Sequence, residues 1–214
     1  KLFVVTLVLS LPLGLLISLF KEAVSKRPTD NFVIRWIVKM PIRFIINVYL
    51  WVFRGTPLLL QLFFFYFGLT IIKLPNGEAI TLSMFTAATI SFVLNYAAYF
   101  AEIYRGGIEA IPVGQYEAAK VLGYSKSQTF FRIVFPQVCK HILPAVTNEI
   151  ITLVKDTSLA FVLAVTEMFT MAKQIAAAQT SMVPYIAAGI FYYVFNLLVA
   201  MIMEKIEEKL NYYH

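Results

Sequence analysis

The sequence predicts an all-α, polytopic membrane protein with about five transmembrane helices, and two observations carry this prediction. The first is composition: of 214 residues, 60% are hydrophobic and 14% are charged, whereas soluble domains are about 45–50% apolar and about 25% charged. A soluble core of this size cannot hide such an excess, so lipid must solvate part of it. The second is that five stretches approach the roughly 20 apolar residues that a spanning helix needs: 2–20, 56–72, 81–104, 141–163 and 184–203.

The loops between these stretches predict the orientation. Most Lys and Arg residues lie in 21–54, in 105–140 and near the C-terminus, whereas the opposite side holds only Lys1, Lys73 and Lys173. Since Lys and Arg gather on the cytoplasmic side, we expect the N-terminus outside and the C-terminus in the cytoplasm. The net charge of +6 thus follows the membrane pattern, and we expect no nucleic-acid partner. We expect the whole chain to form a single membrane domain.

Residues 33–53 fit two interpretations. Arg35, Lys39 and Arg43 recur at every fourth position, so on a helix they would form one cationic stripe. Such a helix suits the inner membrane interface or the approach to the second span. We expect a tilted helix that enters the membrane near Arg54.

The loop at about 105–140 is polar and helix-prone, although it lies between two apolar spans. Residues 117–122 are good helix formers, and Gly123 breaks the run as a C-cap glycine would. Residues 130–134 then begin a second helix, which Pro136 stops or kinks. A helix-turn-helix outside the bilayer favours a docking site for a partner. The alternative is an amphipathic hairpin that lies on the membrane surface.

Sequence motifs for catalysis are missing. No G-x-x-x-x-G-K-[ST] phosphate loop occurs, so another chain must hydrolyse any ATP that drives this protein. The two histidines, His141 and His214, stand far apart, and Cys139 is the only cysteine. We therefore expect no metal site and no internal disulfide. No nucleophile and base are suggestively spaced, so we do not expect an enzyme.

A set of spaced motifs runs through the chain. Glu117, Ala118 and Ala119 are followed by Gly123, Ile133 and Pro136, and the other motifs are AEIYRGGIEAIPVGQYEAA at 101–119, RGTP at 54–57 and KDTSLA at 155–160. Together they resemble permease subunits of ATP-binding-cassette importers for polar amino acids, of the histidine/arginine/lysine/glutamine type. The similarity runs from about Thr6 to the fifth span. One departure is Phe135, where the loop pattern usually has Leu.

The resemblance implies a mechanism. Two permease subunits, which we expect to be identical, form a pathway in the lipid of the prokaryotic cytoplasmic (inner) membrane. Two ATPase subunits beneath them bind ATP and Mg, and this chain itself holds no cofactor. An external binding protein delivers the amino acid, and ATP closes the ATPase dimer and turns the pathway outward. The expected ATPase-coupling residues are Glu117, Ala118, Ala119, Gly123, Tyr124 and Ser125.

Ionisable residues in the fourth predicted span are the best candidates for substrate choice. Such residues cost about 2.5–3.5 kcal/mol at a helix centre and usually face a cavity or a partner. Glu149 and Asp156 are seven residues apart, so they share nearly one helical face and lie about 10 Å apart, with Thr152 between them. This ladder of acceptors suits a basic amino acid, such as arginine, histidine or lysine.

Each candidate has a structural alternative. Asp156 would pair with Lys155 or cap the TSLA turn, and Glu149 would meet a partner across a dimer interface. Asn95, in the middle of the third span, would bind substrate or hydrogen-bond another helix. Glu102 is expected to pair with Arg105 near the inner interface.

Two other functions compete with the importer. An ion-coupled secondary amino acid transporter would use Glu149 and Asp156 as a proton relay, but it leaves the 105–140 loop unexplained. A membrane assembly protein that does not transport would use that loop for docking alone, and two intramembrane carboxylates on one helical face argue against it. Co-purification of a stoichiometric ATPase separates the importer from both.

Overall fold

A computed structural model describes residues 1–25 and 39–210, and helices make up almost all of the described chain. In order, the elements are α1 (Leu2–Ser25), α2 (Met40–Gly55), α3 (Leu58–Tyr66), a 3₁₀ turn (Gly68–Ile71), α4 (Met84–Glu109), α5 (Val113–Val121), α6 (Lys126–Thr129), a π-helical turn (Phe130–Val134), α7 (Phe135–Asp156), a 3₁₀ helix (Thr157–Leu163), α8 (Met168–Gln179) and α9 (Val183–Leu210). No strand occurs within these two described ranges, and the predicted all-α fold class is confirmed.

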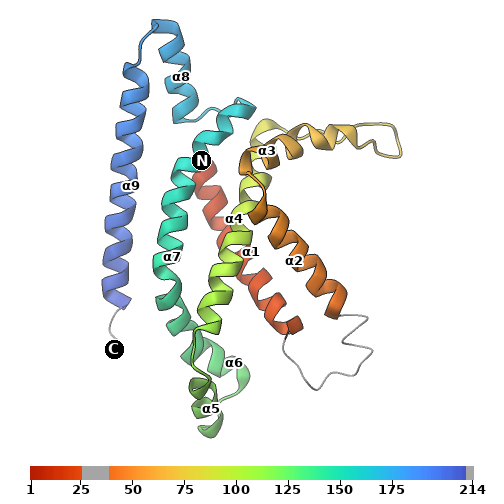
Figure 1. The fold of residues 1–214 in the computed structure, drawn as a ribbon, viewed down its shortest axis with the longest axis vertical. Helices are drawn as coiled ribbons and strands as arrows, with labels where there is room; N and C mark the ends of the chain where they lie inside the picture. The colour runs from red at the N-terminus through yellow and green to blue at the C-terminus, as the bar shows by residue number, and fades with distance from the viewer. Residues whose placement is uncertain (26–38, 211–214) are drawn as a thin grey trace.

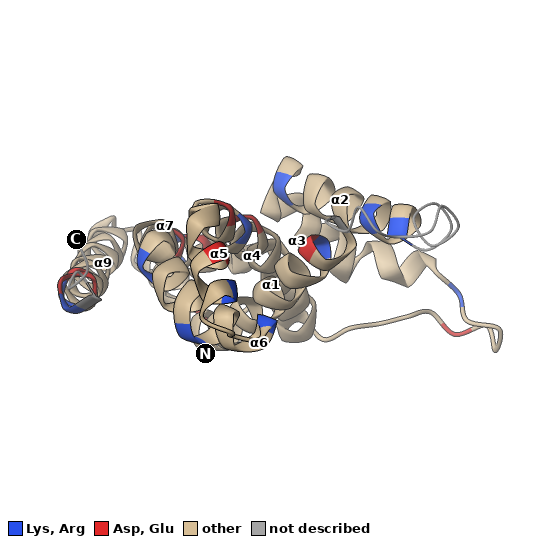
Figure 2. Cartoon of the chain, turned by 90° about the horizontal axis from the view of Figure 1, so that it is seen from below, with Lys and Arg blue, Asp and Glu red and all other residues tan. Residues whose placement is uncertain are grey.

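The long helices pass back and forth between two ends of the molecule (Figure 1). α1, α4 and α9 run toward the end that carries α5 and α6, and α2 and α7 run back. The N-terminus lies away from α5 and α6, whereas α9 ends toward them. In Figure 2, which looks from the α5–α6 end, Lys and Arg mark α2, α7 and the end of α9.

Three of the described helices are long and apolar enough to cross a membrane: Leu2–Val24, Met84–Glu109 and Val183–Lys209. α2 and the segment Leu58–Ile71 pass the same test together but are bent by 110° at their junction. α7 does not appear among the helices that pass; it carries Glu149, Lys155 and Asp156. It lies against α4 on one side and α9 on the other, so other helices cover much of its polar length.

The predicted span at 56–72 is not one helix. Pro57 disfavours the helical conformation at Thr56, whose backbone is extended, with φ −118° and ψ 146°. The helix therefore ends at Gly55, and 56–72 contains the nine residues of α3 and a 3₁₀ turn. The prediction that this stretch is apolar is correct, but hydropathy does not show where the helix is interrupted.

Two other predicted helices have different bounds in the structure. The helix expected at 33–53 is described from Met40 onward as α2, and its first residues, including Arg35, lie outside the described residues. The predicted span 141–163 ends its α-helical part at Asp156. Beyond it, Thr157 and Ser158 donate their hydroxyl hydrogens to the carbonyls of Val154 and Lys155, both at 2.7 Å. Such bonds compete with regular helix geometry.

A row of small side chains seats α1 against α4. Thr6, Ser10, Gly14 and Ser18 recur at every fourth position of α1, and all three hydroxyl-bearing members are buried. A Cβ atom added at Gly14 would lie 2.7 Å from the Cβ of Phe100, so only glycine allows this approach. Small residues at such spacing let membrane helices come close enough for backbone contact.

Candidate functional site

Asp156, at the end of α7, is bound by a tyrosine of α4. The Tyr96 hydroxyl donates to Asp156 Oδ2 at 2.7 Å, and Tyr96 is only 1% exposed. The Asp156 side chain does not cap the 3₁₀ helix that follows it, and no ion pair joins it to Lys155 in the described part of the chain. The carboxylate therefore faces α4 rather than its own turn.

Glu149 lies on the same side of α7. Its charge interacts with those of Asp156 and Arg54, and both carboxylates act on Tyr96. The two acids thus share one side of α7, as predicted from their seven-residue spacing, and the structure adds that both act on Tyr96 of α4. Across residues 1–25 and 39–210, no Lys or Arg forms an ion pair with either acid. Within the described residues, two carboxyl groups therefore come together without an ion-paired Lys or Arg.

Thr152 lies between the two acids in sequence. Its hydroxyl donates to the Asn148 carbonyl of its own helix at 2.9 Å. A hydroxyl that donates in this way keeps its oxygen lone pairs available as acceptors. A substrate contact by Thr152 stays a prediction.

Asn95 is buried, and its amide spans the gap between α4 and the α2–α3 junction. Asn95 Nδ2 donates to the Phe53 carbonyl at 2.8 Å and to Gln61 Oε1 at 3.1 Å. Gln61 Nε2 in turn donates to the Phe53 carbonyl and to Thr56 Oγ1, both at 2.9 Å. These amides satisfy backbone oxygens that the broken helix leaves open, which membrane-depth backbone requires. Its role in substrate binding stays a prediction beside this structural one.

Glu102 lies in a second cluster, in which cations outnumber the acids. Lys21 Nζ lies 2.6 Å from Glu102 Oε1, and Arg105 Nη2 and Arg54 Nη1 lie 2.8 Å and 3.7 Å from Oε2. Arg105 also binds Glu109 at 2.6 Å. The predicted pairing of Glu102 with Arg105 is confirmed, and Lys21 extends it from α4 to α1.

The α5–α6 tip carries the predicted coupling residues. Glu117 and Ala118 are exposed and Ala119 is buried within the tip. At the end of α5, Val121 is 87% exposed and Leu122 is 72% exposed. Two neighbouring apolar side chains left this exposed at a helix end are typical of a surface that another protein covers.

Gly123 ends α5 as the sequence predicts. Its φ is +76°, a region that glycine enters without strain. The Tyr124 amide donates to the Ala119 carbonyl at 3.0 Å, and the Gly123 amide donates to the Lys120 carbonyl at 3.1 Å. These two bonds form a Schellman C-cap. The predicted turn after a short helix is confirmed.

Ser125 then begins α6. Its Oγ accepts from the Gln128 amide at 3.3 Å, and the Ser125 amide donates to Gln128 Oε1 at 2.9 Å. This reciprocal pair is a capping box. The tip is consequently a well-defined helix-turn-helix, because Tyr124 and Ser125 both make hydrogen bonds that fix the turn.

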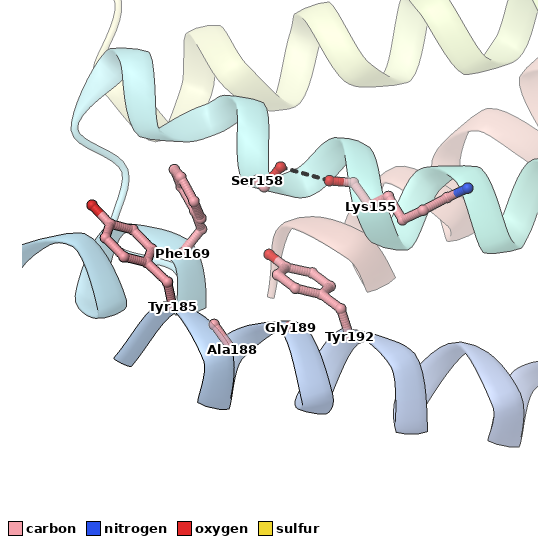
Figure 3. Close-up of a pocket in the computed structure, with 7 residues that line it drawn as sticks. All are labelled: Lys155, Ser158, Phe169, Tyr185, Ala188, Gly189 and Tyr192. Atoms are coloured by element: carbon pink, nitrogen blue, oxygen red, sulfur yellow. Dashed lines mark hydrogen bonds between the residues drawn. The ribbon is translucent and has the colours of Figure 1, made fainter. Parts of the chain in front are cut away.

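A cavity of about 360 Å³ lies between the end of α7 and the helices α8 and α9 (Figure 3). Its lining residues are Lys155, Ser158, Phe169, Tyr185, Ala188, Gly189 and Tyr192. None of the predicted substrate residues lines it. The cavity and the Asp156–Tyr96 contact therefore belong to different sides of α7.

Three residues of this region escaped the sequence analysis as site candidates. Tyr96 looks like any aromatic of an apolar helix, and nothing local predicts a bond to a residue 60 positions later. Gln61 was readable, since a polar amide in an apolar run is the signal that singled out Asn95. Arg54 was interpreted as a mark of membrane entry and as part of the RGTP motif, not as a site residue. In the described residues no group of three or more His, Cys, Asp or Glu side chains is placed to hold a metal ion.

The fold and the site define a class: a helical membrane protein with two carboxyl groups on α7 that have no ion-pair partner in the described residues, and with an exposed helix-turn-helix at one end. The family described as binding-protein-dependent transport system inner membrane component matches residues 38–212, and the chain belongs to this family. It is a permease for amino acid transport of the ATP-binding-cassette class, in an inner membrane.

Curated relatives share this class. The arginine transport system permease protein ArtQ of Bacillus subtilis is 37% identical over 99% of this chain and 88% of its own length. The L-cystine permease protein TcyB of the same organism is 37% identical over 81% and 72%. The octopine permease protein OccM of Rhizobium radiobacter is 34% identical over 95% and 85%.

Solved structures are similar as well. A chain of an amino acid ABC transporter crystallised with histidines superposes with a TM-score of 0.80 at 30% identity, over 98% of this chain and 89% of that one. A chain of the inward-facing MetNI methionine transporter gives a TM-score of 0.71 at 18% identity, over 98% and 93%, and supports the fold alone.

Proposed function

We propose that this permease imports a basic amino acid and that Glu149 and Asp156 bind its positive groups. The observation that carries the proposal is that these two acids face one region without an ion-pair partner in the described residues, while Tyr96 holds one of them at 2.7 Å. A ligand with an α-amino group and a cationic side chain would supply both missing charges. Charge-assisted hydrogen bonds of this kind are the strong ones.

The relatives support this proposal without deciding it. A permease named for arginine is 37% identical to this chain, and so is one named for L-cystine. Cystine carries two ammonium and two carboxylate groups and no net charge, so overall similarity does not decide the substrate. The acids at Glu149 and Asp156 favour a basic one.

The α5–α6 tip would carry the coupling to a partner ATPase. Its exposed apolar residues, Val121 and Leu122, and its rigid turn at Gly123 suit a helix seated in a groove of another chain. The tip lies toward the end at which α9 finishes and away from the N-terminus (Figure 1). With the basic loops on the cytoplasmic side, this arrangement supports a cytoplasmic tip and C-terminus and an external N-terminus.

The remaining partners follow from the same proposal. Because a single chain carries both acids and a complete tip, a second, identical permease would complete the pathway. An external binding protein would deliver the amino acid, and the ATPase subunits would hold ATP and Mg. Co-expression of two copies with different affinity tags tests the identity of the pair: one tag should recover the other.

Uptake by the assembled transporter tests the substrate. We expect Glu149→Gln to lower the uptake of arginine by about tenfold or more, the equivalent of losing about 1.4 kcal/mol of binding, and to spare glutamine. Glu109→Gln, which removes an exposed acid of α4, is the matched control. Unchanged arginine uptake by Glu149→Gln would reject the proposal. Uptake that needs a proton gradient and no ATPase would instead favour a secondary transporter.

Co-purification tests the tip. We expect Leu122→Asp to lose the ATPase, because a charge would have to be buried in an apolar groove. Asn76→Asp adds the same charge to an exposed loop at the opposite end and should retain the ATPase in full. Equal recovery of the ATPase with both variants would place its docking site elsewhere.

A further inference from the structure

A zwitterionic amino acid carries a carboxylate as well as its positive groups, and the two acids of α7 cannot bind it. A carboxylate taken from water into a membrane protein needs a cation or several hydrogen-bond donors. The cations of α4 and α1 are already engaged: Lys21 and Arg105 contact Glu102 at 2.6 Å and 2.8 Å, and Arg105 also contacts Glu109. A free donor for the ligand must come from another residue.

Among the three cations around Glu102, Arg54 is the one whose contacts leave it available. It ends α2, and its side chain is 41% exposed. Its approach to Glu102 is 3.7 Å, longer than a hydrogen bond, and Glu102 is already occupied by Lys21 and Arg105. Its guanidinium lies 5.6 Å from the centre of the Tyr99 ring. A guanidinium offers five N–H donors, and a ring face satisfies none of them as an oxygen would.

The position of Arg54 relates it to the two acids. Among the charges that act on Glu149 is that of Arg54. The Tyr99 ring beneath Arg54 lies 6.4 Å from the Tyr96 ring, and Tyr96 holds Asp156. Tyr99 and Tyr96 of α4 thus lie between Arg54 and Asp156. The charges of both Arg54 and Asp156 act on Glu149.

The junction behind Arg54 is held firmly. Gln61 and Asn95 bind the Phe53 carbonyl at 2.9 Å and 2.8 Å, next to Arg54 in the chain. Thr56 donates its hydroxyl hydrogen to the Val52 carbonyl at 2.7 Å. The backbone that carries Arg54 is therefore fixed by these hydrogen bonds, while its side chain is 41% exposed on the surface of the chain.

Lys155 is the competing cation, because it follows the acids on the same helix. It lines the cavity between α7 and α9, together with Phe169 and Tyr192 (Figure 3). Asp156, its neighbour, turns instead toward Tyr96 of α4. Lys155 therefore belongs to the α9 side of α7 and Arg54 to the α4 side, where the acids lie.

We infer that Arg54 binds the α-carboxylate of the transported amino acid, opposite the positive groups held by Glu149 and Asp156. This inference rests on the proposed import of an amino acid through this site. It holds for any amino acid, basic or neutral, because every one carries the carboxylate. Arg54 would then select amino acids against amines of the same side chain.

The test compares ligands with and without a carboxylate on the assembled permease–ATPase complex. L-arginine is compared with agmatine, its decarboxylated form, and L-glutamine with 4-aminobutanamide, by calorimetric binding. We expect Arg54→Gln to weaken the binding of the amino acid by about tenfold or more, since a bidentate charge-assisted contact is lost. Binding of the decarboxylated partner should stay the same or improve. Lys155→Gln, the matched control, should change neither ligand.

Each outcome decides the inference. Equal loss of both ligands in Arg54→Gln would make Arg54 structural and overturn it, as would unchanged binding of both. Selective loss of the amino acid in Lys155→Gln would transfer the role to Lys155. If Arg54→Gln does not assemble, the wild-type complex still decides: equal affinity for arginine and agmatine, and for glutamine and 4-aminobutanamide, would overturn the inference.

The experiment also separates this inference from the proposed substrate. If the wild-type complex binds glutamine but not arginine, the basic-substrate proposal fails and Arg54 is judged on the glutamine pair. If both amino acids bind and Arg54→Gln leaves them unchanged, only the inference on Arg54 fails. If neither amino acid binds, both fail.

Discussion

Two clusters of the same helix bundle contain acids, one around Glu102 and one around Glu149. They differ in whether cations lie close to the acid. Glu102 is surrounded by Lys21, Arg105 and Arg54 at 2.6, 2.8 and 3.7 Å. Glu149 and Asp156 have no ion-pair partner in the described ranges, and a tyrosine hydroxyl is the closest donor to Asp156. Because an acid inside a membrane protein usually has a partner, the first cluster is balanced within this chain, and we propose that a ligand supplies the cation for the second.

Charge balance distinguishes Glu102, whose ion pairs hold three helices together, from Glu149 and Asp156, which we propose to bind a ligand. Removing Glu102 should damage the folded state, because it leaves cations without a counterion. Removing Glu149 or Asp156 should relieve the empty protein and damage only the liganded one. The predictions below test this contrast, from the largest expected effect to the smallest.

Glu102→Gln should lower the free energy of unfolding most. Breaking a buried ion pair by removing one partner costs about 3–5 kcal/mol. Because the Glu102 side chain is 16% exposed, we expect the free energy of unfolding to fall by about 3 kcal/mol, the lower end of this range. Denaturant unfolding of the purified complex in mixed micelles measures it. A loss no larger than that of a surface pair would remove the distinction between the two clusters.

Glu149→Gln combined with Asp156→Asn should act on ligand-induced stability instead. A ligand at 100 times its Kd stabilises a protein by about 2.7 kcal/mol, and one whose affinity has fallen about 100-fold gives about 0.4 kcal/mol at the same concentration. Without ligand, the double variant should match or exceed the wild type, because two unpaired acids are gone. Thermal unfolding with and without arginine measures both quantities, and an unstable empty variant would contradict the contrast.

Tyr96→Phe should have an intermediate effect. It keeps the buried ring and deletes the hydroxyl that binds Asp156 at 2.7 Å, and hydrogen bonds to charged groups contribute about 1.5–3 kcal/mol. We expect arginine affinity to fall by about tenfold at the lower bound of this range. Tyr99→Phe is the control, since the Tyr99 hydroxyl reaches the Arg54 carbonyl only at 3.4 Å. Equal losses of arginine affinity in the two variants would show that the Tyr96–Asp156 hydrogen bond does not contribute to binding.

Glu109→Gln should have the smallest effect. Its ion pair with Arg105 is short, at 2.6 Å, but the side chains are 33% and 48% exposed, and exposed pairs contribute about 0.2–1 kcal/mol. Because it shares Arg105 with Glu102, it is also the matched control for the Glu102 variant. The difference from wild type should shrink in high salt, whereas the deficit of Glu102→Gln should persist.

The sequence was sufficient for the all-α class and for the helices in which apolar length and helix coincide. The predicted spans 81–104 and 184–203 lie within or nearly match α4 and α9. It failed at 56–72 because hydropathy averages over Thr56 and Pro57, where the backbone turns. It also passed over the stripe of Thr6, Ser10, Gly14 and Ser18, although a repeat of small residues at every fourth position is a readable signal.

The candidate site divides in the same way. Glu149 and Asp156 were readable because a charge in an apolar run is conspicuous, and Gly123 because only one residue type suits its conformation. The partners of those residues were not readable. Tyr96 and Arg54 approach the acids through helix packing, and no local pattern shows which face of α4 meets the end of α2.

The π-helical turn at Phe130–Val134 lies inside an otherwise continuous helical rod from Lys126 in the tip to Asp156 at the far end of α7. A π turn is an α-helix that carries one extra residue in its hydrogen-bond ring, and each residue of an α-helix accounts for about 100° of rotation. The direction in which Glu149 and Asp156 point around the axis of α7 therefore depends on the hydrogen-bond register of the five residues Phe130–Val134 beside the tip. If that ring tightened to α geometry, both acids would swing about a quarter turn away from Tyr96.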